Sequence, residues 1–242
     1  MVSKNQIKLI NNLQQKKFRI SNNLFFAEGQ KVIHELLHSE FKLNHLFATD
    51  AIFDDFDVDT KTLVSQTELN KISALATSNS CLAVFEIPRN KKTNNKDLTV
   101  VLDDIRDPGN LGTIIRLCDW FGICQIVCSQ ETVDVYNPKV VQATMGSLAR
   151  VQVAYCDLIE FISNSELPVY GTFMDGTNVY KSELPSKAIL VFGNEANGIS
   201  KKIEKLIQKR ISIPRFGSIQ KTESLNVATA TAIILSEFKR GL

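Results

Sequence analysis

The chain has 242 residues, 44% of them hydrophobic and 22% charged, which is the composition of an ordinary globular protein with one or two domains. A chain of this size buries a large core without disulfide staples, and a formal net charge of +2 is too small to identify a partner. No apolar run approaches the roughly 18 residues that a membrane span needs, and the N-terminus lacks a signal-peptide core, so we expect a cytoplasmic protein.

Residues 1–90 mix helical and strand patterns. Helical stretches lie at 4–18, 28–38 and 65–76, and a short apolar run at 24–27 leads into the second of them. Short strand-like runs lie at 45–48, 62–64 and 81–87. Ser65 followed by Glu68 is a capping-box pattern, which marks the start of the third helix. We therefore predict a small α/β domain over residues 1–90, and it contains no obvious catalytic residue.

The best linker candidate is the polar segment at residues 89–97, RNKKTNNKD, which has four basic residues and almost nothing apolar. Segments of this composition connect domains instead of packing into them. We therefore predict that the linker separates the first domain from a second domain over residues 98–242.

Residues 98–242 alternate between strand-like and helical segments. Apolar runs lie at 98–102, 123–128, 168–173, 188–192 and 211–213, and helical stretches lie at 111–121, 137–149, 157–163, 200–209 and 224–240. Apolar strands separated by helices predict a parallel sheet that is buried on both faces. Because ligands bind at the carboxyl ends of such strands, we expect the functional residues directly after the apolar runs.

The loop after residues 98–102 leads into a helix that carries polar residues. Asp107 and Pro108 predict a turn and a helix cap, and Asn110 lies in the first turn, where free N–H groups and the positive end of the helix dipole gather. Arg116 follows Asn110 by less than two turns, so both can reach the same end of the sheet. An ordinary helix start with a solvated arginine explains the same residues.

The loop after residues 188–192 is rich in glycine. Gly193 and Gly198 have the spacing of a phosphate-binding loop, but Ile199 stands where such a loop has its lysine, which argues against a nucleotide site. No GxGxxG pattern follows the first strand, which argues against a dinucleotide site. The remaining interpretations are a functional glycine loop with one carboxylate, Glu195, or a tight strand-to-helix turn.

The last predicted helix opens with Ser224 and Asn226, after the run at 211–213 and a polar loop. A hydroxyl or an amide at a helix start ordinarily caps free N–H groups. Capping explains Ser224. It explains Asn226 less well, because asparagine in a first helical turn has low helix propensity.

Three segments together resemble the TrmH/SpoU family of RNA ribose 2′-O-methyltransferases, within the SPOUT class. The segments are DPGNLGTIIR (107–116), LVFGNEANGIS (190–200) and ISIPRFG with ESLNVATA (211–217 and 223–230), and VQATMGSLARV (141–151) is also similar to that family. They occur in the family's order and cover about residues 98–242. Residues 18–37 resemble the start of the small substrate-binding domain that often precedes this catalytic domain.

The resemblance implies methylation of a ribose 2′-hydroxyl in RNA with S-adenosylmethionine as the donor. It also implies a trefoil knot at the C-terminal end of the parallel-sheet domain, and a homodimer with the donor pocket near the subunit interface. By the same resemblance, the expected catalytic residues are Asn110, Arg116, Glu195, Ser224 and Asn226, and the expected donor-binding residues are Gly193, Ile213, Leu225 and Thr172. A separate first domain favours rRNA over tRNA as the substrate.

Arg116 is expected to act on the RNA. A ribose hydroxyl is a poor nucleophile until it loses its proton, and an arginine normally stays protonated. Two roles stay open: the guanidinium grips a phosphate and stabilises developing negative charge, or it becomes the base once a substrate phosphate is bound, as proposed for the family. Glu195 is expected to orient Asn110 or Arg116. Ser224 and Asn226 are expected to fix the loop and the hydroxyl.

Two features depart from the family's pattern. Arg215 stands where the family usually has methionine, and the loop at residues 218–222 is longer than usual. Both bear on the lid of the donor pocket and leave the motif assignment unchanged.

The basic residues gather in three clusters. These are Lys4, Lys8, Lys16, Lys17 and Arg19; Arg89, Lys91, Lys92 and Lys96; and Lys201, Lys202, Lys205, Lys209, Arg210 and Arg215. Any one cluster is explained by a solvated helix face, but three clusters around one predicted site favour contact with RNA phosphates. The acidic residues between 50 and 59 are expected to face away from the RNA.

The cysteines and histidines do not predict a metal site. Cys124 and Cys128 have no second pair and no nearby histidine, and the five cysteines follow no disulfide framework, so we expect buried thiols in a reducing compartment. The three histidines have no carboxylate or cysteine at ligand spacing. Two alternatives to the ribose enzyme remain: a non-catalytic RNA-binding module, and a SPOUT enzyme that methylates a base.

Overall fold

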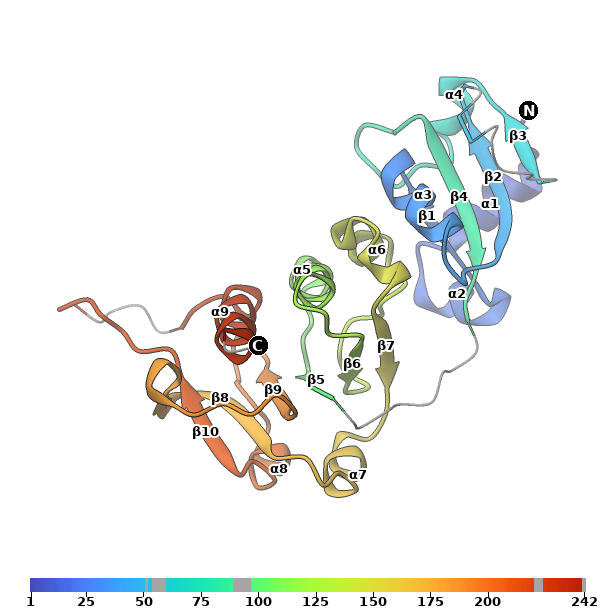
Figure 1. Ribbon diagram of the computed structural model, residues 1–242. Helices are drawn as coiled ribbons and strands as arrows, with labels where there is room; N and C mark the ends of the chain where they lie inside the picture. The colour runs from blue at the N-terminus through green and yellow to red at the C-terminus, as the bar shows by residue number, and fades with distance from the viewer. Residues whose placement is uncertain (51, 54–59, 89–96, 220–223, 241–242) are drawn as a thin grey trace. The chain divides into compact units, whose positions relative to one another are not determined.

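The computed structural model describes residues 1–50, 52–53, 60–88, 97–219 and 224–240, and Figure 1 labels its elements. The chain divides into two compact units. Unit 1 comprises Met1–Asn90 and Asp134–Arg150, and unit 2 comprises Lys91–Val133 and Val151–Leu242. The predicted linker at 89–97 lies, except for residue 97, outside the described residues. The predicted α/β class is confirmed for both units.

Unit 1 contains a mixed sheet with the strand order β1-β4-β2-β3 among the described residues. The strands are β1 (Leu24–Glu28), β2 (Leu43–Ala48), β3 (Lys61–Leu63) and β4 (Cys81–Glu86). The helices are α1 (Lys4–Asn12), α2 (Lys16–Asn22), α3 (Gln30–Leu37), α4 (Gln66–Leu69), α6 (Pro138–Thr144) and the 3₁₀ turn η1 (Ser147–Ala149). The Ser65–Glu68 capping box is present as predicted, although α4 ends at Leu69, well before residue 76.

Side chains pack on both faces of the sheet of unit 1. Successive side chains on β1 point to opposite faces, so neighbouring residues of this strand have different packing partners. Phe26 packs with Ile10 and Leu13 of the α1 region in one apolar core. The neighbouring Phe25 contacts the ring of Tyr136, with ring centroids 4.7 Å apart. Residues 134–150 therefore belong to the packing of unit 1, although they are remote from its other residues in sequence.

Arg19 is fully buried in unit 1 and is held by four hydrogen bonds. Its guanidinium donates to the backbone carbonyls of Leu13 and Gln14 and, through Nε and Nη2, to Oδ2 of Asp134 at 2.9 and 2.5 Å. The sequence-based assignment of Arg19 to an RNA-binding cluster is therefore wrong, because its charge is consumed inside the fold. Lys4, Lys8, Lys16 and Lys17 of the same cluster are exposed.

Replacing Arg19 with alanine should lower the free energy of unfolding by about 3 kcal/mol, because it leaves the largely buried carboxylate of Asp134 without its partner. Lys42→Ala is the matched control, since it breaks the exposed Lys42–Glu86 pair and should cost less than about 1 kcal/mol. Urea unfolding followed by circular dichroism measures both. Equal stability of the Arg19→Ala variant and the parent chain would contradict a structural role for this pair.

Unit 2 contains an all-parallel sheet with the strand order β10-β8-β9-β5-β6-β7 among the described residues. The strands are β5 (Thr99–Asp103), β6 (Gln125–Cys128), β7 (Gln152–Tyr155), β8 (Val169–Asn178), β9 (Ile189–Gly193) and β10 (Lys209–Ser212). The helices are α5 (Pro108–Trp120), α7 (Leu158–Ser163), η2 (Val179–Lys181), α8 (Lys201–Glu204) and α9 (Val227–Lys239). The predicted parallel sheet is confirmed.

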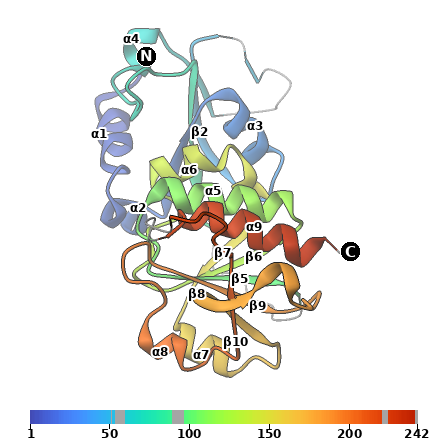
Figure 2. The ribbon, with the colours of Figure 1, turned by 90° about the vertical axis from the view of Figure 1, so that its left-hand side faces the viewer.

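Helices cover both faces of this sheet. Helices α5 and α9 lie side by side over one face, and α7 and α8 lie over the other (Figure 2). On the α7 side, Val101 and Val191 of the central strands pack with Phe161 in one apolar core. The buried faces explain the continuous apolar runs seen in the sequence.

Several predicted elements have different bounds. The edge strand β7 was not predicted, and the helix expected at 200–209 is the short α8 followed by β10. The strand expected at 168–173 continues to Asn178, so Thr172 lies inside β8 instead of at its end. The expectation of buried cysteines holds for Cys81, Cys118 and Cys128, but Cys124 is exposed and Cys156 is half-buried. None of the described helices is long and apolar enough to cross a membrane.

Candidate active site

Two polar loops meet where the strand order of unit 2 reverses. Strands β5 and β9 are neighbours, and their last residues, Asp103 and Gly193, face each other in the register. From β5 the chain continues through β6 and β7 on one side, whereas β8 and β10 lie on the other side. Such a switch point at the carboxyl ends of parallel strands is where open α/β sheets bind ligands.

The first loop ends in a helix cap that places Asn110. Asp107 is the N-cap of α5, and its Oδ1 accepts a hydrogen bond from the backbone N–H of Asn110 at 2.8 Å. Pro108 occupies the first helical position, where its missing N–H costs nothing. This predicted cap is confirmed. It leaves the amide side chain of Asn110 available for contacts with the neighbouring loops.

Asn110 joins Glu195 and Asn226 into a hydrogen-bonded chain across three loops. Its Nδ2 donates to Oε1 of Glu195 at 2.6 Å, and its Oδ1 accepts from Nδ2 of Asn226 at 2.8 Å. Because Glu195 is acceptor-only when ionised, the direction of the chain is fixed from Asn226 through Asn110 to the carboxylate. The expectation that Glu195 contacts Asn110 or Arg116 is met at Asn110.

Asn226 also begins α9. Its Oδ1 accepts hydrogen bonds from the backbone N–H groups of Ala228 and Thr229 at 2.9 and 3.2 Å. The interpretation that capping explains Ser224 better than Asn226 is therefore wrong: the helix starts later than residue 224, at Val227, and Asn226 is its N-cap. One amide thus performs two tasks, since its oxygen caps the helix and its nitrogen holds Asn110.

The two tasks of Asn226 can be separated by substitution. Asn226→Ala should lower the free energy of unfolding by about 1 kcal/mol, because the cap is lost. Asn226→Asp keeps an oxygen for the cap and should retain nearly the parent stability, while it removes the donor to Asn110. Chemical denaturation of the two variants measures the difference. Equal losses in both would show that the cap contributes nothing to stability.

The glycine loop after β9 is held by Asn194, which the sequence analysis did not single out. Asn194 forms a two-way backbone bridge with Gly198, and its side-chain Nδ2 donates to the carbonyl of Asp104 at 2.8 Å. Its Oδ1 accepts from the N–H groups of Ala196 and Asn197. The loop is so closely folded that a Cβ on Gly193 would lie 2.2 Å from the backbone of Gly198 and Ile199.

Asp103 binds the C-terminal end of the same loop, at Ser200. This buried carboxylate accepts a hydrogen bond from the backbone N–H of Ser200 at 2.8 Å. In the sequence, Asp103 is the first residue after the apolar run 98–102, which is where functional residues were expected, but it was not among the predicted site residues. Asp103 therefore serves the shape of the site.

Arg116 and Ser224 lie outside the hydrogen-bonded chain. Both side chains are exposed, and within the described part of the chain neither makes a hydrogen bond or an ion pair. Arg116 lies on α5, one residue short of two turns beyond Asn110. Without a partner among the residues that the structure describes, its guanidinium is available for an anion from outside.

Of the residues expected to hold the methyl donor, two lie on neighbouring strands, one follows the next strand and one precedes α9. Gly193 ends β9, and Thr172 on the adjacent β8 donates through Oγ1 to the carbonyl of Val191 at 3.3 Å. Ile213 directly follows β10 and is half-buried. Leu225 is 49% exposed beside Asn226.

The third basic cluster is only partly available for RNA. Lys201, Lys202 and Lys205 are exposed around α8. Arg210, in contrast, pairs with Glu204 and Asp175 at 2.6 Å each and lies over the ring of Phe173. The second cluster and most of the acidic residues between 50 and 59 lie outside the described residues.

The arrangement suits chemistry in which groups are positioned and charge is stabilised. The hydrogen-bonded residues offer two amides and one carboxylate, and α5, which carries Asn110, also carries a guanidinium that has no partner among the described residues. In the described ranges, no group of three or more histidine, cysteine, aspartate or glutamate side chains could hold a metal ion.

Two family matches cover most of the chain. Residues 97–236 match the SpoU rRNA Methylase family, and residues 4–83 match the MRM3-like substrate binding domain. The first match covers all nine residues expected to act in catalysis or donor binding.

Similar proteins extend over the whole chain. The 23S rRNA (guanosine(2553)-2′-O)-methyltransferase RlmP of Bacillus subtilis is 28% identical over 241 residues, which are 96% of each chain. A TrmH-family protein from Porphyromonas gingivalis has a solved structure that superposes with a TM-score of 0.92, at 38% identity over 100% of both chains. The AdoMet-bound rRNA methyltransferase from Sinorhizobium meliloti superposes with a TM-score of 0.87, at 28% identity over 100% of this chain and 97% of that one.

Proposed function

The chain belongs to the SpoU rRNA methylase family, and we propose that it transfers a methyl group from S-adenosylmethionine to a ribose 2′-hydroxyl of rRNA. The observation that carries this proposal is the series of hydrogen bonds from Asn226 through Asn110 to Glu195, at the switch point of the sheet. Relatives over the full length support the choice: the one from B. subtilis is an rRNA 2′-O-methyltransferase, and the one from S. meliloti binds AdoMet.

S-adenosylmethionine supplies an activated methyl group and needs no further cofactor. Gly193, Ile213 and Leu225 would hold its adenosine through backbone groups, and Thr172 would form part of the pocket wall. In unit 2, the closely folded loop after Gly193 and the half-exposed side chain of Leu225 fit such a ligand. The donor pocket would lie in a trefoil knot formed by the C-terminal segment, as in the family.

Arg116 is the residue that acts on the acceptor in this proposal. Its guanidinium has no partner within the described residues, so it can bind an RNA phosphate beside the reacting ribose. A fixed positive charge there stabilises the negative charge that develops on the 2′-oxygen as its proton leaves. If Arg116 acts as the base instead, as proposed for the family, its guanidinium must first lose its own proton before it can accept that of the 2′-hydroxyl.

The Asn226–Asn110–Glu195 chain holds the reacting groups in line. A displacement at a methyl carbon needs oxygen, carbon and sulfur nearly collinear, and correct positioning alone can supply several kcal/mol. The amides of Asn110 and Asn226 are locked to α5 and α9, so they can present a rigid edge to the ribose. Ser224, which is exposed two residues before Asn226, would contribute its hydroxyl to the same edge.

We also propose a role for each domain, an oligomeric state and a cellular location. The 1–90 domain would select the RNA, the 98–242 domain would carry out the transfer, and the chain would act as a homodimer in the cytoplasm. The match of residues 4–83 to a substrate-binding domain supports the first assignment. Sedimentation of the purified chain tests the dimer, and a monomer that is fully active would remove it from the mechanism.

The reaction is tested by incubating the purified chain with labelled S-adenosylmethionine and rRNA, followed by nuclease digestion and mass analysis of the nucleosides. A 2′-O-methyl nucleoside is expected. A base-methylated nucleoside would make the chain a base methyltransferase, and a failure to bind the donor in calorimetry would make it a non-catalytic RNA-binding module. Mapping of modified nucleotides in cells with and without the protein identifies the target and separates rRNA from tRNA.

A further inference from the structure

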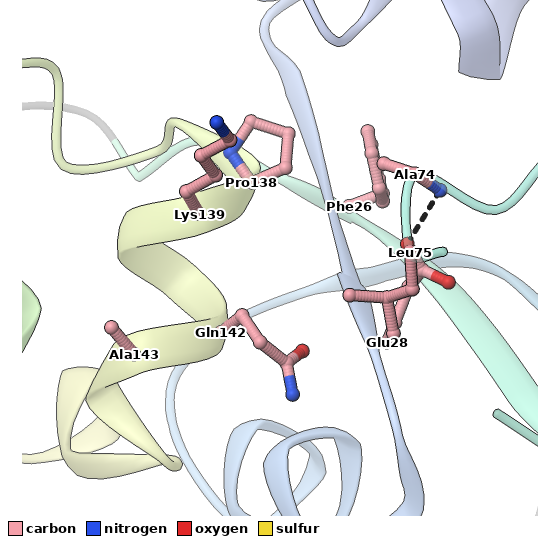
Figure 3. Close-up of a pocket in the computed structure, with 8 residues that line it drawn as sticks. All are labelled: Phe26, Glu28, Ala74, Leu75, Pro138, Lys139, Gln142 and Ala143. Atoms are coloured by element: carbon pink, nitrogen blue, oxygen red, sulfur yellow. Dashed lines mark hydrogen bonds between the residues drawn. The ribbon is translucent and has the colours of Figure 1, made fainter. Parts of the chain in front are cut away.

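A cavity of about 250 Å³ lies within unit 1, between β1 and α6 (Figure 3). Phe26, Leu75 and Ala143 give it apolar walls, and Glu28, Lys139 and Gln142 are its polar side chains. The volume is just below the roughly 300–1,000 Å³ of pockets for drug-sized molecules, so it suits one small ligand such as a pair of fused rings. None of these residues belongs to the proposed methyl-transfer site.

The carboxylate of Glu28 is the polar anchor of the cavity. It is 5% exposed, and it accepts hydrogen bonds from Ser73 Oγ at 2.5 Å and from the backbone N–H of Ala74 at 2.8 Å. One bond falls on each oxygen, and each oxygen has two lone pairs, so both retain an acceptor position. Burial raises the pKa of Glu28, while the two hydrogen bonds oppose that shift. A ligand with two adjacent donors would satisfy both positions.

Helix α6 brings hydrogen-bond donors to the opposite wall. Figure 3 shows Gln142 extending from α6 toward β1, and Lys139 lies one turn earlier on the same helix. A lysine offers donors alone, and a glutamine amide offers both donors and an acceptor. A ligand that fits the cavity therefore carries donors on the edge facing Glu28 and acceptors elsewhere.

We propose that this cavity binds one unstacked guanine base of the RNA substrate, a base other than that of the reacting nucleotide. The N1–H and N2–H₂ groups of guanine are two neighbouring donors that match Glu28, and its O6 and N7 are acceptors that match Lys139 and Gln142. Specific RNA recognition usually reads such splayed bases by their Watson–Crick edges. The inference deepens the proposed function and rests on RNA being the substrate.

Other bases match the cavity less well. Adenine presents an acceptor, N1, where guanine presents a donor, and that acceptor would face the carboxylate of Glu28. Inosine keeps the N1–H donor of guanine but lacks the N2 amino group, so it tests the second donor alone. Pyrimidines are single rings and would leave part of the apolar wall uncovered.

Equilibrium binding of short oligouridines to the full chain tests the proposal. The RNAs carry one central guanosine, inosine or adenosine, and fluorescence anisotropy measures their dissociation constants. The guanosine RNA should bind about 10-fold or more tightly than the adenosine RNA, which is within the discrimination of one good bidentate contact, and the inosine RNA should fall between them. Equal binding of the three RNAs, tighter binding of adenosine, or no binding at all would overturn the proposal.

Two variants assign the preference to the cavity. Glu28→Gln keeps the side-chain shape but loses the charge and one acceptor, and should abolish the difference between guanosine and inosine. Ala143→Leu fills the cavity and should bring guanosine binding to the level of adenosine. Glu86→Gln, at the exposed pair with Lys42, and Ala76→Leu, at an exposed position, are matched controls that should retain the preference. A preference that survives both cavity variants would exclude this site.

The design separates this inference from the proposed function. The binding assay needs no methyl donor, so a chain that fails to bind S-adenosylmethionine or to methylate RNA can still show the base preference. Conversely, a chain that methylates RNA without any guanine preference refutes the cavity alone. Circular dichroism verifies folding, and if Glu28→Gln fails to fold, Ala143→Leu carries the test by itself.

Discussion

Replacement of Gly193 by valine is expected to abolish binding of S-adenosylmethionine. The Cβ of any residue at this position would lie 2.2 Å from the backbone carbon of Gly198 and the nitrogen of Ile199, far inside a normal contact. The loop from Asn194 to Gly198 would have to move, and with it the backbone groups proposed to hold the adenosine. Isothermal titration calorimetry of the folded variant measures the loss.

Gly198→Ala is the matched control for this prediction. Gly198 has a φ of +67°, which strains an alanine, but a Cβ there meets no atom within 4 Å. The control should lose roughly 1 kcal/mol of stability and still bind the donor. If Gly193→Val binds the donor with the affinity of the parent chain, the pocket lies elsewhere.

Replacement of Arg116 by alanine should lower the rate of methyl transfer by roughly 10²-fold or more, the scale of losing one group that stabilises a transition state. The affinity for S-adenosylmethionine should change little, because the exposed guanidinium makes no hydrogen bond with the described residues that are proposed to hold the donor. Single-turnover methylation of rRNA and calorimetry with the donor give the two numbers.

Arg240→Ala provides the comparison, since it also removes an exposed arginine from unit 2, at the end of α9. Its methylation rate should remain close to that of the parent chain. Arg116→Lys should recover only part of the activity, because an ammonium cannot reproduce the planar fork that grips a phosphate. Near-normal turnover by Arg116→Ala would remove Arg116 from the mechanism.

Features that depend on neighbouring residues were predictable from the sequence. The Asp107 cap, the Ser65–Glu68 capping box and the parallel sheet follow from local spacing and from apolar runs, and all three are present. The first residue of a helix is harder to predict when two neighbouring polar residues could both cap it. Ser224 and Asn226 are both suitable before α9, and in the structure Asn226 is the cap and accepts hydrogen bonds from two backbone N–H groups.

Features that depend on distant partners were not predictable. Nothing near Arg19 in the sequence indicates that Asp134 neutralises it, so its charge was counted as available for RNA. Likewise, Asn194 looks like an ordinary turn residue until its contacts with Asp104 and Gly198 are known. The four half-exposed residues of β7 lack the apolar run by which the central strands were found.

Unit 1 is built from two separate stretches of the sequence, which limits how parts of this protein can be exchanged with those of a relative. Its two pieces, Met1–Asn90 and Asp134–Arg150, are joined by the buried Arg19–Asp134 pair and by the contact between Phe25 and Tyr136. A chimera that exchanges the first 90 residues for those of a relative would therefore import a foreign partner for α6. An exchange that keeps these contacts must include residues 134–150 as well, although these lie within the stretch 97–236 that matches the SpoU rRNA Methylase family.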